Sequence, residues 1–101
     1  MKEITKKDYM KAREKVLNNV NKSNEKYIHD FVKYYQIGGL YVIYSRNLNA
    51  VSDMAKVAED VFNIKPSFAK YILDNIEEIG KQYPDEKDLL SNLANQNVRE
   101  G

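Results

Sequence analysis

The side chains best suited to chemistry are polar and basic residues spaced along one short stretch. Lys65, Ser67 and Lys70 follow one another closely, and Tyr71 and Asn75 come shortly after them. Ammonium, hydroxyl and amide groups of this kind contact phosphate oxygens and base edges in nucleic acids. The stretch therefore predicts a nucleic-acid contact surface.

Catalytic patterns are weak or missing. His29 is the only histidine and there is no cysteine, so the ligand sets usual for structural zinc cannot be assembled. Neighbouring carboxylates, as in Glu77-Glu78, point about 100° apart on a helix and do not form an acid–base pair. We therefore expect a protein that is not an enzyme and that uses no metal and no cofactor.

Two amphipathic segments must position the polar stretch. Apolar residues recur at intervals of three and four in residues 51–62 and again in residues 68–79. Between them, Asn63 can end a helix in the left-handed conformation, and Pro66 suits the first turn of the next helix. The spacing predicts a helix-turn-helix-like unit over residues 51–80, with its second helix at 66–80.

The residues that carry this pattern are similar to those of a known family. The unit resembles the two-helix core of bacterial helix-turn-helix DNA-binding regulators, in the residues Val57-Ala58-Glu59-Asp60-Val61, Ile64 and Ser67-Phe68-Ala69-Lys70-Tyr71-Ile72-Leu73. In that family a small residue such as Ala58 lets the helices approach, and an apolar turn residue such as Ile64 fills their angle. The turn departs from the family pattern at Phe62, where glycine is common. The resemblance implies a small transcriptional regulator that places helix 66–80 in the major groove of double-stranded DNA. A homodimer is compatible with this mode of binding.

Charge is unevenly distributed along the chain. Residues 1–36 hold nine Lys/Arg against five Asp/Glu, although the whole chain nets only +1. Basic side chains of this region could hold the phosphate backbone, whereas the acidic end of helix 66–80 opposes phosphate contact. The expected DNA-binding residues are Lys7, Lys11, Arg13, Lys56, Lys65, Ser67, Lys70, Tyr71 and Asn75.

The remaining segments also favour helices. Thr5 and Asp8 form a capping box for a first helix, and a second helix fits residues 25–36, followed by a break or a bend at Gly38-Gly39. Residues 40–45 could be a short strand, but no partner strand is evident, so a helix is favoured. A last short helix follows Pro84. We predict an all-α fold, a compact bundle of about five helices in one domain spanning residues 1–101, with residues 1–4 and 95–101 frayed.

A second hypothesis needs no nucleic acid. The chain could be a non-enzymatic protein-binding module, such as a phage-encoded inhibitor or an immunity-type protein, that binds one protein partner. Half of the eight tyrosines fit the core (Tyr9, Tyr35, Tyr44 and Tyr71), whereas the others have less obvious inward positions and could form a binding surface (Tyr27, Tyr34, Tyr41 and Tyr83). No apolar run approaches the roughly 20 residues that cross a bilayer, and no signal peptide is evident, so we expect a cytoplasmic protein with no membrane partner.

Overall fold

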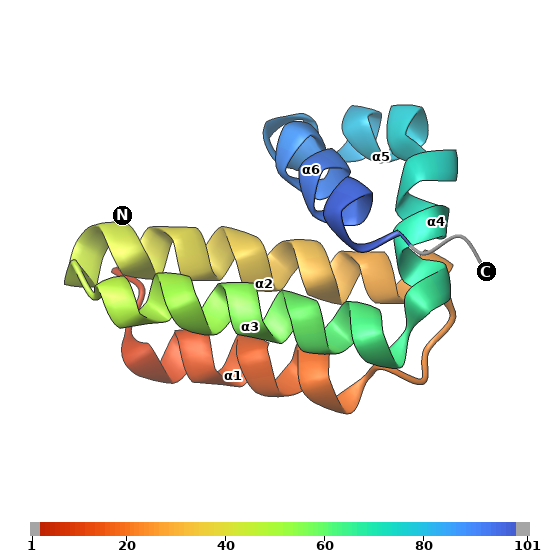
Figure 1. The fold of residues 1–101 in the computed structure, drawn as a ribbon. Coiled ribbons are helices and arrows are strands. Elements are labelled where there is room, and N and C mark those ends of the chain that lie inside the picture. Colours follow the sequence, from red (N-terminus) through yellow and green to blue (C-terminus); the bar gives the residue numbers. More distant parts are fainter. Residues whose placement is uncertain (1–2, 99–101) are drawn as a thin grey trace. The chain divides into compact units, whose positions relative to one another are not determined.

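The computed structural model describes residues 3–98, and its regular structure in that range is entirely helical (Figure 1). The elements are α1 (Lys6–Asn18), α2 (Asn24–Ser45), α3 (Leu48–Ile64), α4 (Pro66–Asp74), α5 (Ile76–Gln82), the 3₁₀ helix η1 (Pro84–Glu86) and α6 (Lys87–Asn97). The predicted all-α class is confirmed. Residues 40–45 belong to α2, so the alternative of a short strand there is wrong.

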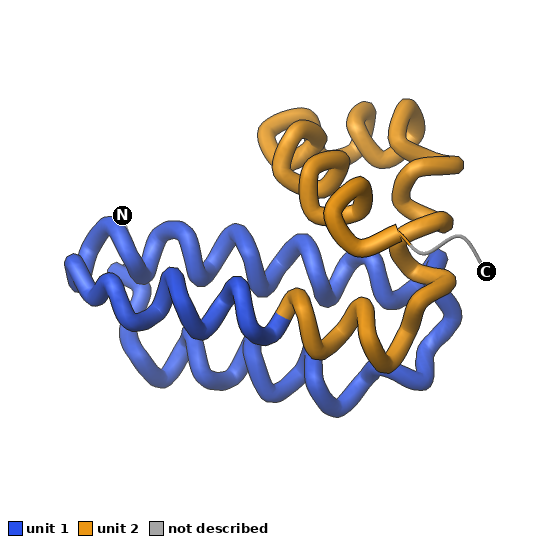
Figure 2. The backbone as a smooth tube through the Cα atoms, viewed as in Figure 1, with its two compact units in different colours: residues 1–57 blue, residues 58–101 orange. Residues whose placement is uncertain are grey.

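The chain divides into two compact units, residues 1–57 and residues 58–101 (Figure 2). Helix α3 is continuous through the boundary between them. Each unit is described by itself below. The single domain expected from the sequence stays a prediction, because compact units of this size can belong to one folding domain.

In the first unit, α1 packs against α2, and the first part of α3 lies beside them (Figure 1). The capping box at the start of α1 is as predicted, since the Thr5 amide donates to Asp8 Oδ2 at 3.0 Å and the Asp8 amide donates to Thr5 Oγ1 at 3.3 Å. The buried apolar residues of this unit are Tyr9, Ala12, Val16, Tyr27, Ile28, Phe31, Val32, Tyr34, Tyr35, Tyr41, Ala50 and Val57.

Of the break or bend predicted at Gly38-Gly39, the break is wrong, because α2 runs through both glycines. Gly38 is buried, and a Cβ added there would lie 2.7 Å from Met54 Sδ and 3.4 Å from the Tyr9 ring. The missing side chain lets α3 and α1 approach α2 closely. Packing on these neighbours therefore outweighs the low helix propensity of glycine.

In the second unit, α4 packs against α6, and α5 and η1 connect the two. The rings of Phe62 at the end of α3 and Phe68 on α4 stack with centroids 5.7 Å apart. Lys65 alone separates the two helices. The buried apolar residues here are Ala58, Val61, Phe62, Phe68, Ala69, Ile72, Ile79, Leu90 and Ala94.

The predicted helix 66–80 is wrong in its length, because it ends at Asp74 and a new helix starts at Ile76. The backbone N–H of Asn75 is shared between the carbonyls of Tyr71 and Ile72. The side-chain Nδ2 of Asn75 also donates to the Tyr71 carbonyl, at 2.8 Å. A side chain that competes for helical carbonyls in this way ends a helix. Asn63 stays helical, since Arg46 is the only non-glycine residue with positive φ among residues 3–98.

The tyrosines and the chain ends differ in part from expectation. Tyr9 and Tyr35 are buried as predicted, but Tyr44 is exposed, and three tyrosines assigned no inward position are buried (Tyr27, Tyr34 and Tyr41). Residues 95–97 are helical, so the prediction of fraying is wrong for them. Residues 1–2 and 99–101, also expected to fray, lie outside the described residues.

Candidate functional site

Five of the residues predicted to bind DNA lie in the second unit, around α4. Ser67 and Lys70 are exposed, and Lys65 is half-buried. Lys70 Nζ lies 2.7 Å from Asp74 Oδ2, one turn further along the same helix. Tyr71 is half-buried and stacks on Phe68, and Asn75 donates to the Tyr71 carbonyl. The structure therefore leaves Ser67 and Lys70 as the exposed members of this set in the first turns of α4.

The electrostatics of this unit oppose contact with phosphates. Residues 58–101 hold five Lys/Arg against nine Asp/Glu, a net charge of −4. Desolvation lowers the pKa of Lys65, because partial burial disfavours its charged form. The Asp74 carboxylate offsets the charge of Lys70. A phosphate backbone would gain little from this surface.

The other four predicted residues lie in the first unit, which holds eleven Lys/Arg against six Asp/Glu in residues 1–57. Lys7, Lys11 and Lys56 are exposed. Arg13 is already paired, because its Nε and Nη2 donate to Asp53 at 2.8 and 3.2 Å. Lys7 and Lys11 share α1, whereas Lys56 comes from α3.

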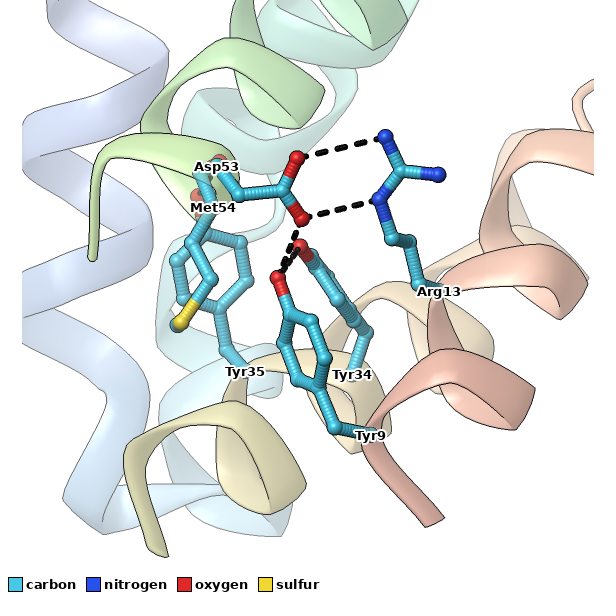
Figure 3. A network of polar contacts seen from close by, with 6 residues as sticks. All are labelled: Tyr9, Arg13, Tyr34, Tyr35, Asp53 and Met54. Atoms are coloured by element: carbon cyan, nitrogen blue, oxygen red, sulfur yellow. Dashed lines mark hydrogen bonds and ion pairs between the residues drawn. The ribbon is translucent and has the colours of Figure 1, made fainter. Parts of the chain in front are cut away.

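Arg13 belongs to a polar cluster that joins all three helices of the first unit, formed with Tyr9, Tyr34 and Asp53 (Figure 3). The Tyr9 hydroxyl donates to Asp53 Oδ2 at 2.5 Å and lies 2.9 Å from the Tyr34 hydroxyl. Beside the cluster, the Tyr35 hydroxyl donates to the Met54 carbonyl at 3.1 Å. This cluster was not predicted, because Asp53 lies 40 residues from Arg13 in the chain.

The protonation states of the residues in this Asp53 cluster favour a structural role over a catalytic one. Burial, helped by the hydrogen bond to Asp53, raises the pKa of Tyr9 to about 12, and burial raises the pKa of Tyr34 further. Partial burial alone would raise the pKa of Asp53, but the hydrogen bonds from Arg13 and Tyr9 outweigh it and lower that pKa. At neutral pH both tyrosines keep their protons, and the Asp53 carboxylate already accepts from Tyr9 and Arg13. The cluster is a clamp between helices, with no group poised to take a substrate proton.

A groove of about 360 Å³ opens between α1 and α2, also within the first unit. Its lining combines three lysines and one aspartate with apolar side chains, in the set Ile4, Asp8, Lys11, Ala12, Lys15, Lys33 and Ile37. Lys11 was predicted to bind phosphate, whereas Lys15 and Lys33 were not predicted. The spacing of four between Lys11 and Lys15 puts them on one face of α1, but only the packing of α2 shows that Lys33 faces the same groove.

Three exposed apolar side chains lie where α2 ends and α3 begins. Ile43 is 69% exposed, Leu48 75% and Val51 50%. Met54 packs at Gly38, so α2 and α3 run side by side, and the two-residue connection between them places these three side chains at one end of the pair. The exposed polar residues next to them in the chain are Ser45, Arg46, Asn49 and Ser52, of which Arg46 alone is charged. We call Ile43, Leu48 and Val51 the apolar corner.

Residues 3–98 hold no candidate metal site. His29 is exposed, and no three residues of the His, Cys, Asp and Glu types gather there as a metal site would require. None of the helices described in this range is both long enough and apolar enough to span a bilayer.

Comparisons of the chain with models of protein families, with curated proteins and with solved structures give no match. The function is therefore inferred from the surfaces of the two units.

Proposed function

We propose that this chain is a non-enzymatic protein-binding module that acts in the cytoplasm and holds one protein partner at the apolar corner. The observation that carries the proposal is the exposure of three large apolar side chains, Ile43, Leu48 and Val51, at the end of two packed helices where these helices join. Large apolar side chains gathered on a surface mark interaction sites, because single exposed ones are ordinary but clusters are costly in water.

The surroundings of the apolar corner indicate the chemistry of the partner. Its neighbours Ser45, Asn49 and Ser52 are polar but uncharged. A partner that buries this surface therefore needs an apolar centre and a rim of hydrogen-bonding groups, the arrangement found in protein interfaces. A strongly charged ligand such as a phosphate would find only Arg46 to pair with here.

A pull-down compares the wild type with a double variant, Ile43→Ser with Leu48→Ser. Tagged protein should retain one stoichiometric partner from lysate after nuclease treatment, and the double variant should lose it. Met10→Ser is the matched control, because Met10 is also exposed but lies on α1. Loss of the partner on nuclease digestion, or its retention by the double variant, would contradict the proposal.

DNA binding is a second candidate, favoured by the position of α4. A single residue separates it from α3, and Ser67 and Lys70 are exposed in its first turns, the part of a recognition helix that reaches bases. The net charge of −4 on residues 58–101 and the pairing of Lys70 with Asp74 make it the weaker candidate.

Fluorescence anisotropy of labelled random duplex DNA, at low and near-physiological salt, tests this second candidate. A regulator should show binding that weakens steeply as salt rises, and alanine at Lys65, Ser67 and Lys70 should reduce it. An affinity that the triple variant leaves unchanged would exclude α4 as the recognition helix.

A further inference from the structure

The groove between α1 and α2 has a basic part and an apolar part. Lys15 and Lys33 come from the C-terminal half of α1 and the facing half of α2, and Lys11 lies one turn before Lys15. Ile4 and Ile37 line the groove further along. The groove is therefore amphipathic along its length.

The apolar part continues along α2 beyond the groove. Leu40 follows Ile37 by three positions and Tyr44 follows Leu40 by four, so the three lie on one stripe of the helix with Lys33. Leu40 is 43% exposed and Tyr44 41%. From Lys33 to Tyr44 this stripe runs about 16 Å at the rise of an α-helix.

The carboxylates of Asp8 and Asp30 offset only part of the positive charge of the three groove lysines. Among the carboxylates of residues 3–98, none forms an ion pair with Lys11 or Lys33. Asp8 lines the groove, but its carboxylate already accepts from the Thr5 amide and hydroxyl. Lys15 Nζ lies 3.8 Å from Asp30, which also pairs with Lys22 at 3.1 Å, so one carboxylate is shared by two ammonium groups.

We propose that this groove binds an acidic amphipathic helix of a protein partner, with its carboxylates on Lys11, Lys15 and Lys33 and its apolar side chains on Ile37, Leu40 and Tyr44. Two packed antiparallel helices with a groove between them, here α1 and α2, offer a surface into which an amphipathic helix can dock, with anchors at intervals of three and four. The residues proposed to bind this helix do not include any residue of the apolar corner. The inference therefore goes beyond the proposed function, and the proposed function can hold even if this inference is wrong.

The arrangement of charge favours a helix over other anions. The three lysines come from both walls of the groove, Lys11 and Lys15 from α1 and Lys33 from α2. A single phosphate would occupy only the basic part of the groove. A nucleic-acid backbone would leave the apolar half of the groove uncovered. A helix with carboxylates on one part and leucines on the next matches both halves.

The probe is a labelled synthetic peptide, a helix of about 12 residues with leucines on one stripe and glutamates at one end. Fluorescence anisotropy measures its binding to the full chain at low salt. The test variant is Lys11→Glu with Lys33→Glu, and the matched control is Lys6→Glu with Lys81→Glu. The control pair is exposed, lies outside the groove and changes the net charge equally. Helical circular dichroism checks that both variants fold.

The groove variant should bind the peptide about 10-fold more weakly or worse, whereas the control should change affinity less than about 2-fold. A peptide of the same composition in scrambled order should bind as weakly as the groove variant binds the ordered one. Equal losses in the two variants would show a bulk charge effect and overturn the proposal. Binding to duplex DNA or to phosphatidylserine vesicles in preference to the ordered peptide would overturn it as well.

Discussion

Replacing Asp53 with alanine tests whether the Asp53 cluster holds the helices of the first unit together. Asp53 accepts two hydrogen bonds from Arg13 and one from Tyr9, so Asp53→Ala removes all three. The side chains of Arg13 and Asp53 are 30% and 31% exposed, so water screens the ion pair. Its contribution to the unfolding free energy is therefore about 1 kcal/mol. The buried Tyr9 hydroxyl keeps its hydrogen bond with Tyr34 but loses a charged acceptor. This loss lowers the unfolding free energy by about a further 1–2 kcal/mol. The expected loss of unfolding free energy is about 2–3 kcal/mol.

Urea unfolding followed by tyrosine circular dichroism in the near ultraviolet is the assay. Six of the eight tyrosines lie in residues 1–57, so the signal reports mainly on the first unit. Asp60→Ala is the matched control, because Asp60 is an exposed aspartate on the same helix, and we expect a change of at most about 0.5 kcal/mol.

A cycle that combines Asp53→Ala with Arg13→Ala should give a coupling energy of about 1 kcal/mol. Equal unfolding free energies for the Asp53 and Asp60 variants would refute the assignment of the cluster as a clamp. A coupling energy near zero would show that the Tyr9 hydroxyl, and not the ion pair, carries the effect.

Three further predictions concern stability. Burial raises the pKa of Tyr9 to about 12 and those of Tyr27, Tyr34 and Tyr35 further, above their value of about 10 in the unfolded chain. Their contribution to stability is therefore complete below about pH 10 and is lost as pH rises through their folded-state pKa values. The absorbance of the tyrosinate band should rise for these four residues only when the helical circular dichroism is lost. Full ionisation of the tyrosines with the helices intact would contradict this expectation. Arg46 has a φ of 56°, so Arg46→Gly should raise the urea midpoint by relieving about 1 kcal/mol of backbone strain, and a lower midpoint would argue against it. Tyr27→Phe should lower the unfolding free energy by about 1–2 kcal/mol, because the Tyr27 hydroxyl donates to the buried Val16 carbonyl at 2.6 Å, whereas Tyr44→Phe at an exposed site should change it little.

The features predictable from the sequence were those that neighbouring residues determine. The capping box at Thr5 and the start of α4 at Pro66 depend on side chains within one helical turn, so local chemistry was enough. Gly38 was misinterpreted because the same residue breaks an isolated helix and permits close packing in a folded one. The end of α4 at Asn75 depends on how one amide side chain competes for carbonyls, which no periodicity reports.

The candidate sites were harder to predict because they combine residues from different helices. Asp53 reaches Arg13 from another helix, and Lys33 shares its groove with Lys11 and Lys15 only through the register of α1 on α2. The lysines of α1 were recognisable as a basic face. Their partners were not, since helical spacing fixes which residues share one helix face but does not fix which neighbour covers it.

The hydrogen bonds of Tyr27 and Tyr35 affect how this sequence can change in evolution. Both hydroxyls donate to backbone carbonyls of other helices, those of Val16 and Met54. The Val16 carbonyl lies in the last turn of α1, where no later helical amide reaches it, so Tyr27 satisfies an acceptor that the helix end leaves open. A backbone carbonyl is present whatever side chain its residue carries. In related sequences we therefore expect positions 16 and 54 to vary among apolar residues of similar size, while the tyrosines at 27 and 35 are retained.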